Sequence, residues 1–169
     1  MNNINLNGLN SDDRFEKLPI EVESLVSNID KRVYIIFVVD DKKTLMEVNP
    51  YEASMLAFVY KGLYLNSHIQ TIHQLFVKYL EYSKFEIEEL VVESKVGDVI
   101  YCTAKIIDQK LNRSFTVLSL VDGIILSIIS KAPIYIIKNV WQQMEEFDED
   151  WDYEEYIVDF ENDDDEDED

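Results

Sequence analysis

The chain has 169 residues, of which 47% are hydrophobic, and a formal net charge of −20. This length suits one domain, and the apolar content is sufficient for a packed core. The longest apolar run, residues 115–137, is interrupted by Asp122 and Lys131, so we expect no membrane-spanning helix. The polar, asparagine-rich start lacks the basic and apolar regions of a signal peptide, and we therefore predict a cytoplasmic protein.

The first half of the domain predicts a β-hairpin followed by a helix. Residues 18–26 and 32–39 are strand-like, and a turn-forming Asp-Asp-Lys-Lys sequence leads into a returning strand. A helix then begins with Asn49 as its N-cap and ends at Gly62. Four apolar side chains share one face of this helix, which we expect to be buried: Tyr51, Met55, Phe58 and Val59.

The next segment, residues 71–85, predicts an amphipathic helix. Five apolar residues recur with helical spacing, and we expect this stripe to face the core: Ile72, Leu75, Phe76, Tyr79 and Leu80. A hairpin of strands 86–94 and 98–107 follows, with Gly97 in the positive-φ position of its turn. Cys102 lies in the second strand and has no cysteine partner, and we expect it to be a core residue.

The apolar run at 115–137 contains one carboxylate, Asp122, although an unpaired charge is costly in an apolar interior. The run divides most simply into a strand, a helix over 120–130 and a second strand over 133–137. Ser119 is then the N-cap, and Asp122 lies in the third helical position beside free backbone N–H groups. A capping role and a functional role both stay open. Hairpins with separate helices predict a single compact α+β domain with mixed or antiparallel strands and two to four packed helices.

The C-terminal end of the sequence carries most of the acidity. Residues 145–169 contain 17 Asp and Glu and no Lys or Arg, whereas the first 144 residues have 18 acids and 15 bases. We predict a flexible lead (1–15), a domain (16–146) and a disordered acidic tail (147–169) that is dispensable for folding. The tail suits a solubilising role. Its interleaved aromatic residues also suit a segment that folds on a basic protein partner or on the protein's own active surface.

Three helix starts and one strand carry a resemblance to a known family. A Glu-Ala pair at 52–53 opens the first helix, His73 opens the second, Asp122 opens the third, and Ala-Pro-Ile at 132–134 begins the following strand. In this order and spacing, over residues 33–144, the chain resembles the bifunctional nuclease domain family.

The resemblance implies a phosphodiesterase that cleaves DNA and RNA, on a compact α+β fold that is often oligomeric. Such chemistry needs a base or a metal-bound water, and positive charge beside the phosphate oxygens. Glu52, His73 and Asp122 are the implied catalytic residues, and Glu52 and Asp122 the implied ligands of Mg²⁺ or Mn²⁺. Each also has a plain structural explanation, because acids are favoured in first helical turns and His73 borders an apolar stripe.

The cationic part of the family pattern has no counterpart here. Ile69 and Ser119 stand where the family motifs have arginine, and Gln74 stands where they have aspartate. The lysines and arginines also form no dense basic stripe of the kind that nucleic-acid binding requires. Two hypotheses follow. One is a divergent nuclease with weak or lost activity on DNA or RNA; the other is a non-catalytic oligomeric interaction module whose acidic aromatic tail binds a basic partner.

Overall fold

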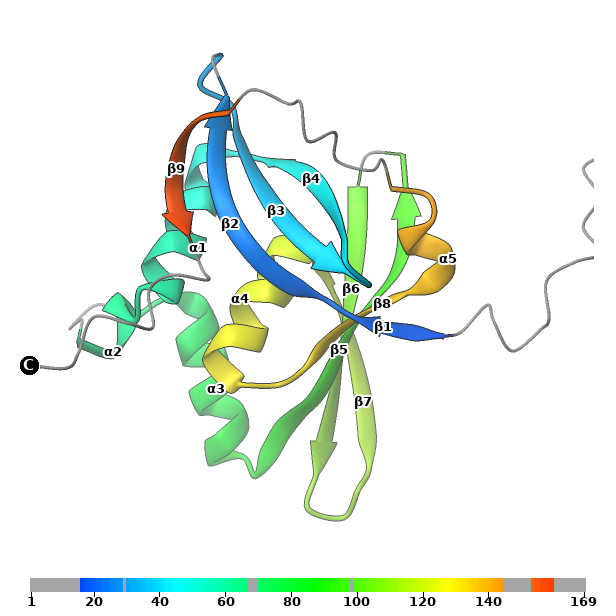
Figure 1. The fold of residues 1–169 in the computed structure, drawn as a ribbon. Coiled ribbons are helices and arrows are strands. Elements are labelled where there is room, and N and C mark those ends of the chain that lie inside the picture. The colour runs from blue at the N-terminus through cyan, green and yellow to red at the C-terminus, as the bar shows by residue number, and fades with distance from the viewer. Residues whose placement is uncertain (1–15, 29, 67–69, 98, 145–152, 160–169) are drawn as a thin grey trace, which may run out of the picture.

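The computed structural model describes residues 16–28, 30–66, 70–97, 99–144 and 153–159 (Figure 1). The strands are β1 (Lys17–Pro19), β2 (Glu21–Asn28), β3 (Val33–Val39), β4 (Lys42–Val48), β5 (Phe85–Val96), β6 (Val99–Asp108), β7 (Arg113–Ser119), β8 (Ile134–Ile137) and β9 (Tyr153–Asp159). The helices are α1 (Pro50–Tyr60), α2 (Leu63–Asn66), α3 (Ile72–Tyr82), α4 (Leu120–Ser130) and α5 (Lys138–Trp141). The predicted lead and the rest of the predicted tail lie outside these ranges.

The strands form two sheets, and the predicted hairpins form within them. One sheet has the order β1-β8-β5-β6-β7 and the other the order β4-β3-β2-β9. Strands β5 and β8 are parallel, and the other pairs are antiparallel, so the first sheet is mixed. Asp40 and Asp41 both have positive φ in the turn between β3 and β4, the geometry of a tight hairpin turn. The α+β prediction is confirmed.

The two sheets share one hydrophobic core. The chain passes from the first sheet to the second at Ile20, where β1 ends and β2 begins, and the Ile20 N–H donates to Ile134 O of β8 at 3.2 Å. A continuous cluster of buried side chains includes residues of both sheets and of α1, α3, α4 and α5. Phe37 of β3 also contacts Trp141 of α5, with ring centroids 6.2 Å apart.

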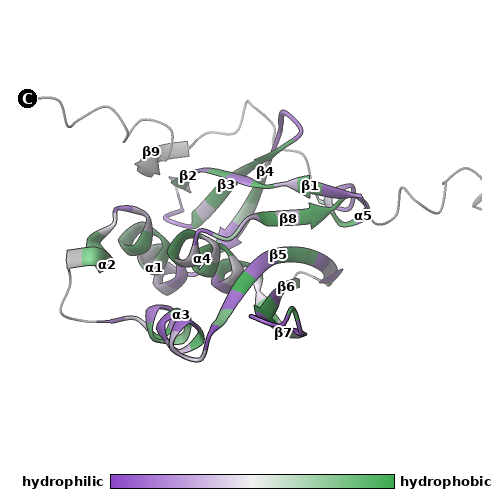
Figure 2. Cartoon of the chain, turned by 90° about the horizontal axis from the view of Figure 1, so that it is seen from below, coloured by the Kyte–Doolittle hydropathy of each residue, from purple (hydrophilic) through white to green (hydrophobic). Residues whose placement is uncertain are grey.

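Helix α4 is the central helix of the fold. It packs against α1 on one side and α3 on the other, and it lies on β5, β6 and β7 (Figure 2). Its bounds confirm the predicted helix over 120–130, and Ser119 is its N-cap as predicted. Cys102 of β6 is fully buried beneath it, as expected. No helix in the described ranges is long and apolar enough to cross a membrane.

The apolar stripes that the sequence placed in the core are partly exposed, which corrects the prediction. On α3, Ile72 is 71% exposed and Tyr79 is 66% exposed, whereas the buried residues are Gln74, Val77 and Leu80. On α1, Tyr51 is exposed and the buried residues are Ala53, Leu56 and Val59. The reason is the direction of packing. Helix α3 packs against α4 and β5 among the described elements, and the side chains that it buries are Gln74, Val77 and Leu80, of which only Leu80 belongs to the predicted stripe.

The prediction of an unstructured tail also needs correction at residues 153–159. These residues form β9, which pairs antiparallel with β2 so that Leu25 faces Val158 and Val26 faces Tyr156. The charge block suggested disorder, yet this segment contains two tyrosines, an isoleucine and a valine, residues that are enriched in strands. Pairing with the buried strand β2 therefore outweighs the local charge.

Candidate functional site

All three residues implied by the family resemblance lie in first helical turns, where capping interactions place them. At α1, Asn49 Oδ1 accepts the Glu52 N–H at 2.9 Å, and Glu52 Oε2 accepts the Asn49 N–H at 3.1 Å. This reciprocal arrangement is a capping box, which satisfies backbone donors that the helix leaves free. The carboxylate of Glu52 therefore has a structural role.

Helix α3 also begins with a capping box. Thr71 Oγ1 accepts the Gln74 N–H at 3.2 Å, and Gln74 Oε1 accepts the Thr71 N–H at 2.8 Å. Gln74 is buried and stands where the family motif has aspartate, so its role here is to cap α3. The box fixes the first turn of α3 and with it the direction of the neighbouring His73.

The third helix start brings two of the candidate residues together. Ser119 Oγ accepts the Asp122 N–H at 3.1 Å and donates its hydroxyl to Asp122 Oδ2 at 2.8 Å. The other carboxylate oxygen, Asp122 Oδ1, lies 2.9 Å from His73 Nε2. Helices α3 and α4 thus meet at their N-terminal ends, and the side chains of His73 and Asp122 are 14% and 46% exposed.

The order of the contacts from His73 to Asp122 to Ser119 limits the acid–base chemistry that these side chains can perform. A carboxylate accepts hydrogen bonds, so His73 Nε2 carries the proton of the contact and Nδ1 is the basic nitrogen of a neutral ring. His73 Nδ1 is buried and has no hydrogen-bond partner among the described residues. Asp122 stands between His73 and Ser119, whereas a nucleophilic triad needs histidine in the middle. In this conformation the basic nitrogen of His73 is buried, and the hydroxyl of Ser119 contacts the carboxylate of Asp122 and not the imidazole.

Glu52 does not join the other two residues. The hydrogen bonds of its side chain and amide are those to Asn49, and Glu52 does not line the groove that contains His73 and Asp122. Both oxygens of Asp122 are already engaged. Within the described ranges, no three His, Cys, Asp or Glu side chains lie close enough to hold a metal ion. That Glu52 and Asp122 bind Mg²⁺ or Mn²⁺ stays a prediction, since one or two carboxylates with bound waters can hold Mg²⁺.

The His73 and Asp122 pair lies in an open cavity of about 510 Å³ between α3, β7 and α4, which we call the α3–β7 groove. Figure 2 shows the arrangement of α3, α4 and β7, the elements that carry the lining residues. Its polar members are Thr116 and the His73 and Asp122 pair. Its apolar lining comprises Ile72, Leu75, Phe76, Tyr79, Leu118 and Leu126. The helical spacing of the sequence identifies most of these α3 residues but assigns them to the core.

No lysine or arginine lines the α3–β7 groove in the described part of the chain. Two cations of β6 and β7 are engaged with acids. Lys105 Nζ lies 2.6 Å from Glu88 and 3.2 Å from Glu89, and Arg113 Nε lies 3.7 Å from Glu88. These contacts with Glu88 and Glu89 raise the pKa of Lys105. Burial works against ionisation of Glu89, but hydrogen bonds from Lys17 and Lys105 hold its pKa below the ordinary value.

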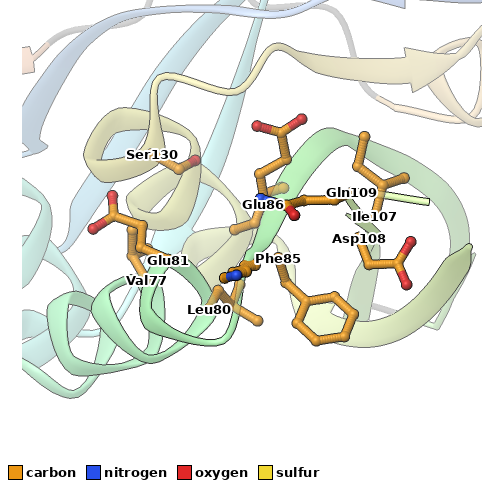
Figure 3. A pocket seen from close by; sticks show the side chains of 11 residues that line it. Val77, Leu80, Glu81, Phe85, Glu86, Ile107, Asp108, Gln109 and Ser130 are labelled. Atoms are coloured by element: carbon orange, nitrogen blue, oxygen red, sulfur yellow. The ribbon is translucent and has the colours of Figure 1, made fainter. Parts of the chain in front are cut away.

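A second cavity of about 430 Å³ lies at the other end of α3, against β5 and β6. Three acids line it, Glu81, Glu86 and Asp108, and their carboxylates point in different directions (Figure 3). Asp108 accepts the N–H groups of Lys110 and Asn112 at 2.8 Å and so holds the turn before β7. Because the acids do not converge and Asp108 has a structural role, the α3–β7 groove is the stronger candidate site.

No protein-family model matches the chain, and the search of curated proteins finds no match.

Proposed function

We propose that this protein is a non-catalytic interaction module that binds an apolar segment of a partner in the α3–β7 groove. The observation that carries the proposal is the exposed apolar lining of the groove, with Ile72, Leu75 and Tyr79 about half exposed or more. Burial of apolar surface contributes about 25 cal/mol per Å², so covering these side chains favours association. Clustered exposed apolar residues of this kind mark interaction sites. The acidic residues after β9 are a further contact for a basic surface of the same partner.

The electrostatics of the groove support a neutral ligand over a polyanion. The charged side chain in the groove that would face a ligand is the carboxylate of Asp122, which repels phosphate. A nuclease instead needs cations that stabilise the transferring phosphoryl oxygens.

A peptide-display selection on the full chain tests the proposal. Tyr79→Glu places a charge in the groove, and Tyr82→Glu is the matched control, since Tyr82 is 90% exposed on the same helix and does not line the groove. We expect apolar peptides to be enriched, and their affinity to fall at least tenfold with Tyr79→Glu and to be unchanged with Tyr82→Glu. Selection without enrichment, or equal loss in both variants, would contradict the proposal.

A divergent nuclease is the second candidate, and the contact between His73 and Asp122 favours it. These residues lie 49 positions apart, yet their side chains meet beside a groove. The test is cleavage of single-stranded RNA and duplex DNA by the full chain with Mg²⁺ or Mn²⁺. Cleavage that Asp122→Asn abolishes in a folded protein would establish the nuclease and reject the non-catalytic proposal. We expect no cleavage by either protein.

A further inference from the structure

Strand β7 differs from the other strands at the sheet edges. The described sheets end in β1, β7, β4 and β9. Strand β1 has three residues, while β4 and β9 each have three charged residues among seven, which disfavours pairing with another chain. Strand β7 also has seven residues, but Arg113 is its only charged one. Within the described structure β7 pairs with β6 alone, so its outer edge is open to a further strand.

The sequence of β7 is complementary to itself. In an antiparallel pair of two β7 strands centred on Thr116, Phe115 of each copy faces Val117 of the other. Phe115 is 65% exposed and Val117 is 66% exposed, so the pairing buries two exposed apolar side chains per copy. Aromatic and β-branched residues directly opposite each other stabilise antiparallel strands. A two-fold interface requires this reciprocity, in which residue i contacts residue j and residue j contacts residue i.

The surroundings of β7 fit the same register. In this register Arg113, the charged residue of the strand, lies opposite Ser119 of the other copy, so no like charges face each other along the pair. The two-fold axis of such a pair is perpendicular to the sheet and keeps the helices of both copies on one side.

We propose that two copies of this chain pair through antiparallel β7 strands centred on Thr116, so that a second copy is the partner that covers this surface. The inference goes beyond the proposed function, because the side chains that the pairing buries, Phe115 and Val117, do not line the α3–β7 groove. The two five-stranded sheets become one continuous sheet of the dimer.

Sedimentation velocity of the full chain over a concentration series tests the pairing. Val117→Lys introduces a charge at the centre of the interface, and Val96→Lys is the matched control. Val96 is also a strand valine that is 66% exposed, but it lies at the turn of the β5–β6 hairpin. We expect the unmodified chain and Val96→Lys to sediment as dimers and Val117→Lys as a monomer. An unmodified chain that stays monomeric, or a dimer that survives Val117→Lys, would overturn the inference.

Disulfide formation tests the register without depending on a destabilising substitution. Thr116→Cys places two thiols opposite each other across the axis, whereas the two thiols of Ser114→Cys lie about 13 Å apart along the strands. We expect oxidation to link Thr116→Cys into dimers and to leave Ser114→Cys monomeric on a denaturing gel. The native Cys102 is buried and does not compete. Equal linking of both variants would reject the register. If the chain is monomeric but still selects apolar peptides, only the self-pairing is rejected. If the chain is monomeric and the peptide selection also fails, the proposed function is rejected as well.

Discussion

Gly123→Ala tests how closely α4 approaches the sheet beneath the candidate site. A Cβ atom on Gly123 would lie 2.7 Å from Cys102 Sγ and 3.0 Å from Cys102 Cβ. Cys102 is fully buried and belongs to the central cluster of the core, so it has little room to move. Overpacking of this kind typically costs about 1–3 kcal/mol. Alanine is favoured over glycine in a helix by about 1 kcal/mol. Because the contact with Sγ would be shorter than 3.0 Å at a fully buried site, we expect the upper part of the range for overpacking, about 2–3 kcal/mol, and so a net loss of about 1–2 kcal/mol in the free energy of unfolding.

Urea unfolding followed by circular dichroism, at one protein concentration, measures this loss. Cys102→Ala provides the control because it removes the nearer of the two contacts. In the Cys102→Ala background, the cost of Gly123→Ala should fall but not vanish, since the contact at 3.0 Å with Cβ remains. The close approach of α4 to β6 would be refuted if Gly123→Ala left the protein as stable as before. An equal cost in both backgrounds would show that the strain does not come from Cys102.

Three further predictions concern the cap, the last strand and the buried thiol. Ser119→Ala removes the N-cap of α4 and should cost about 0.5–2 kcal/mol by urea unfolding, while Ser119→Thr should restore most of it; equal stability of all three proteins would contradict the capping role. Truncation after residue 146 removes β9 from β2 and should lower the melting temperature, whereas unchanged melting would support a tail dispensable for folding. Burial raises the pKa of Cys102 to about 12. Because the folded pKa is above the unfolded value of about 8.5, this group contributes its full stability below that value and loses it as pH rises toward 12. Relative to Cys102→Ala, the unmodified chain should therefore lose unfolding free energy between about pH 8.5 and 12, and parallel pH profiles would contradict this.

The local signals of the sequence predict the elements of the fold well. Helix α4 occupies residues 120–130 as predicted, because Ser119 is a good N-cap and the preceding strand ends there. Asn49 and the turn-forming pair Asp40 and Asp41 act in the same way, through hydrogen bonds and backbone conformations that involve only neighbouring residues. Such local interactions can be predicted from a single sequence because they do not depend on which helices and strands pack together.

The predictions that fail concern which face of a helix or strand packs against which neighbouring element. Helix α3 has an apolar stripe, and its spacing predicts a helix correctly, but its buried side includes Gln74 while Ile72 and Tyr79 are exposed. Periodicity identifies the apolar face and cannot tell a core from an interaction surface. Strand β9 is not predicted, for a related reason. Its sequence is highly charged, which locally favours disorder, and its pairing with β2 is a long-range contact.

Asp122 shows how the two kinds of information combine at the candidate site. Its position beside Ser119 follows from the capping pattern, and the helix residues after it, Ile124 and Ile125, are buried. The apolar run accommodates the charge because the carboxylate lies at the helix start, 46% exposed, where the hydroxyl of Ser119 and the ring of His73 both contact it. The contact with His73 depends on the packing of α3 against α4 and has no local signal. The exposed surface beside Asp122 is the apolar groove, on which the proposed binding function rests.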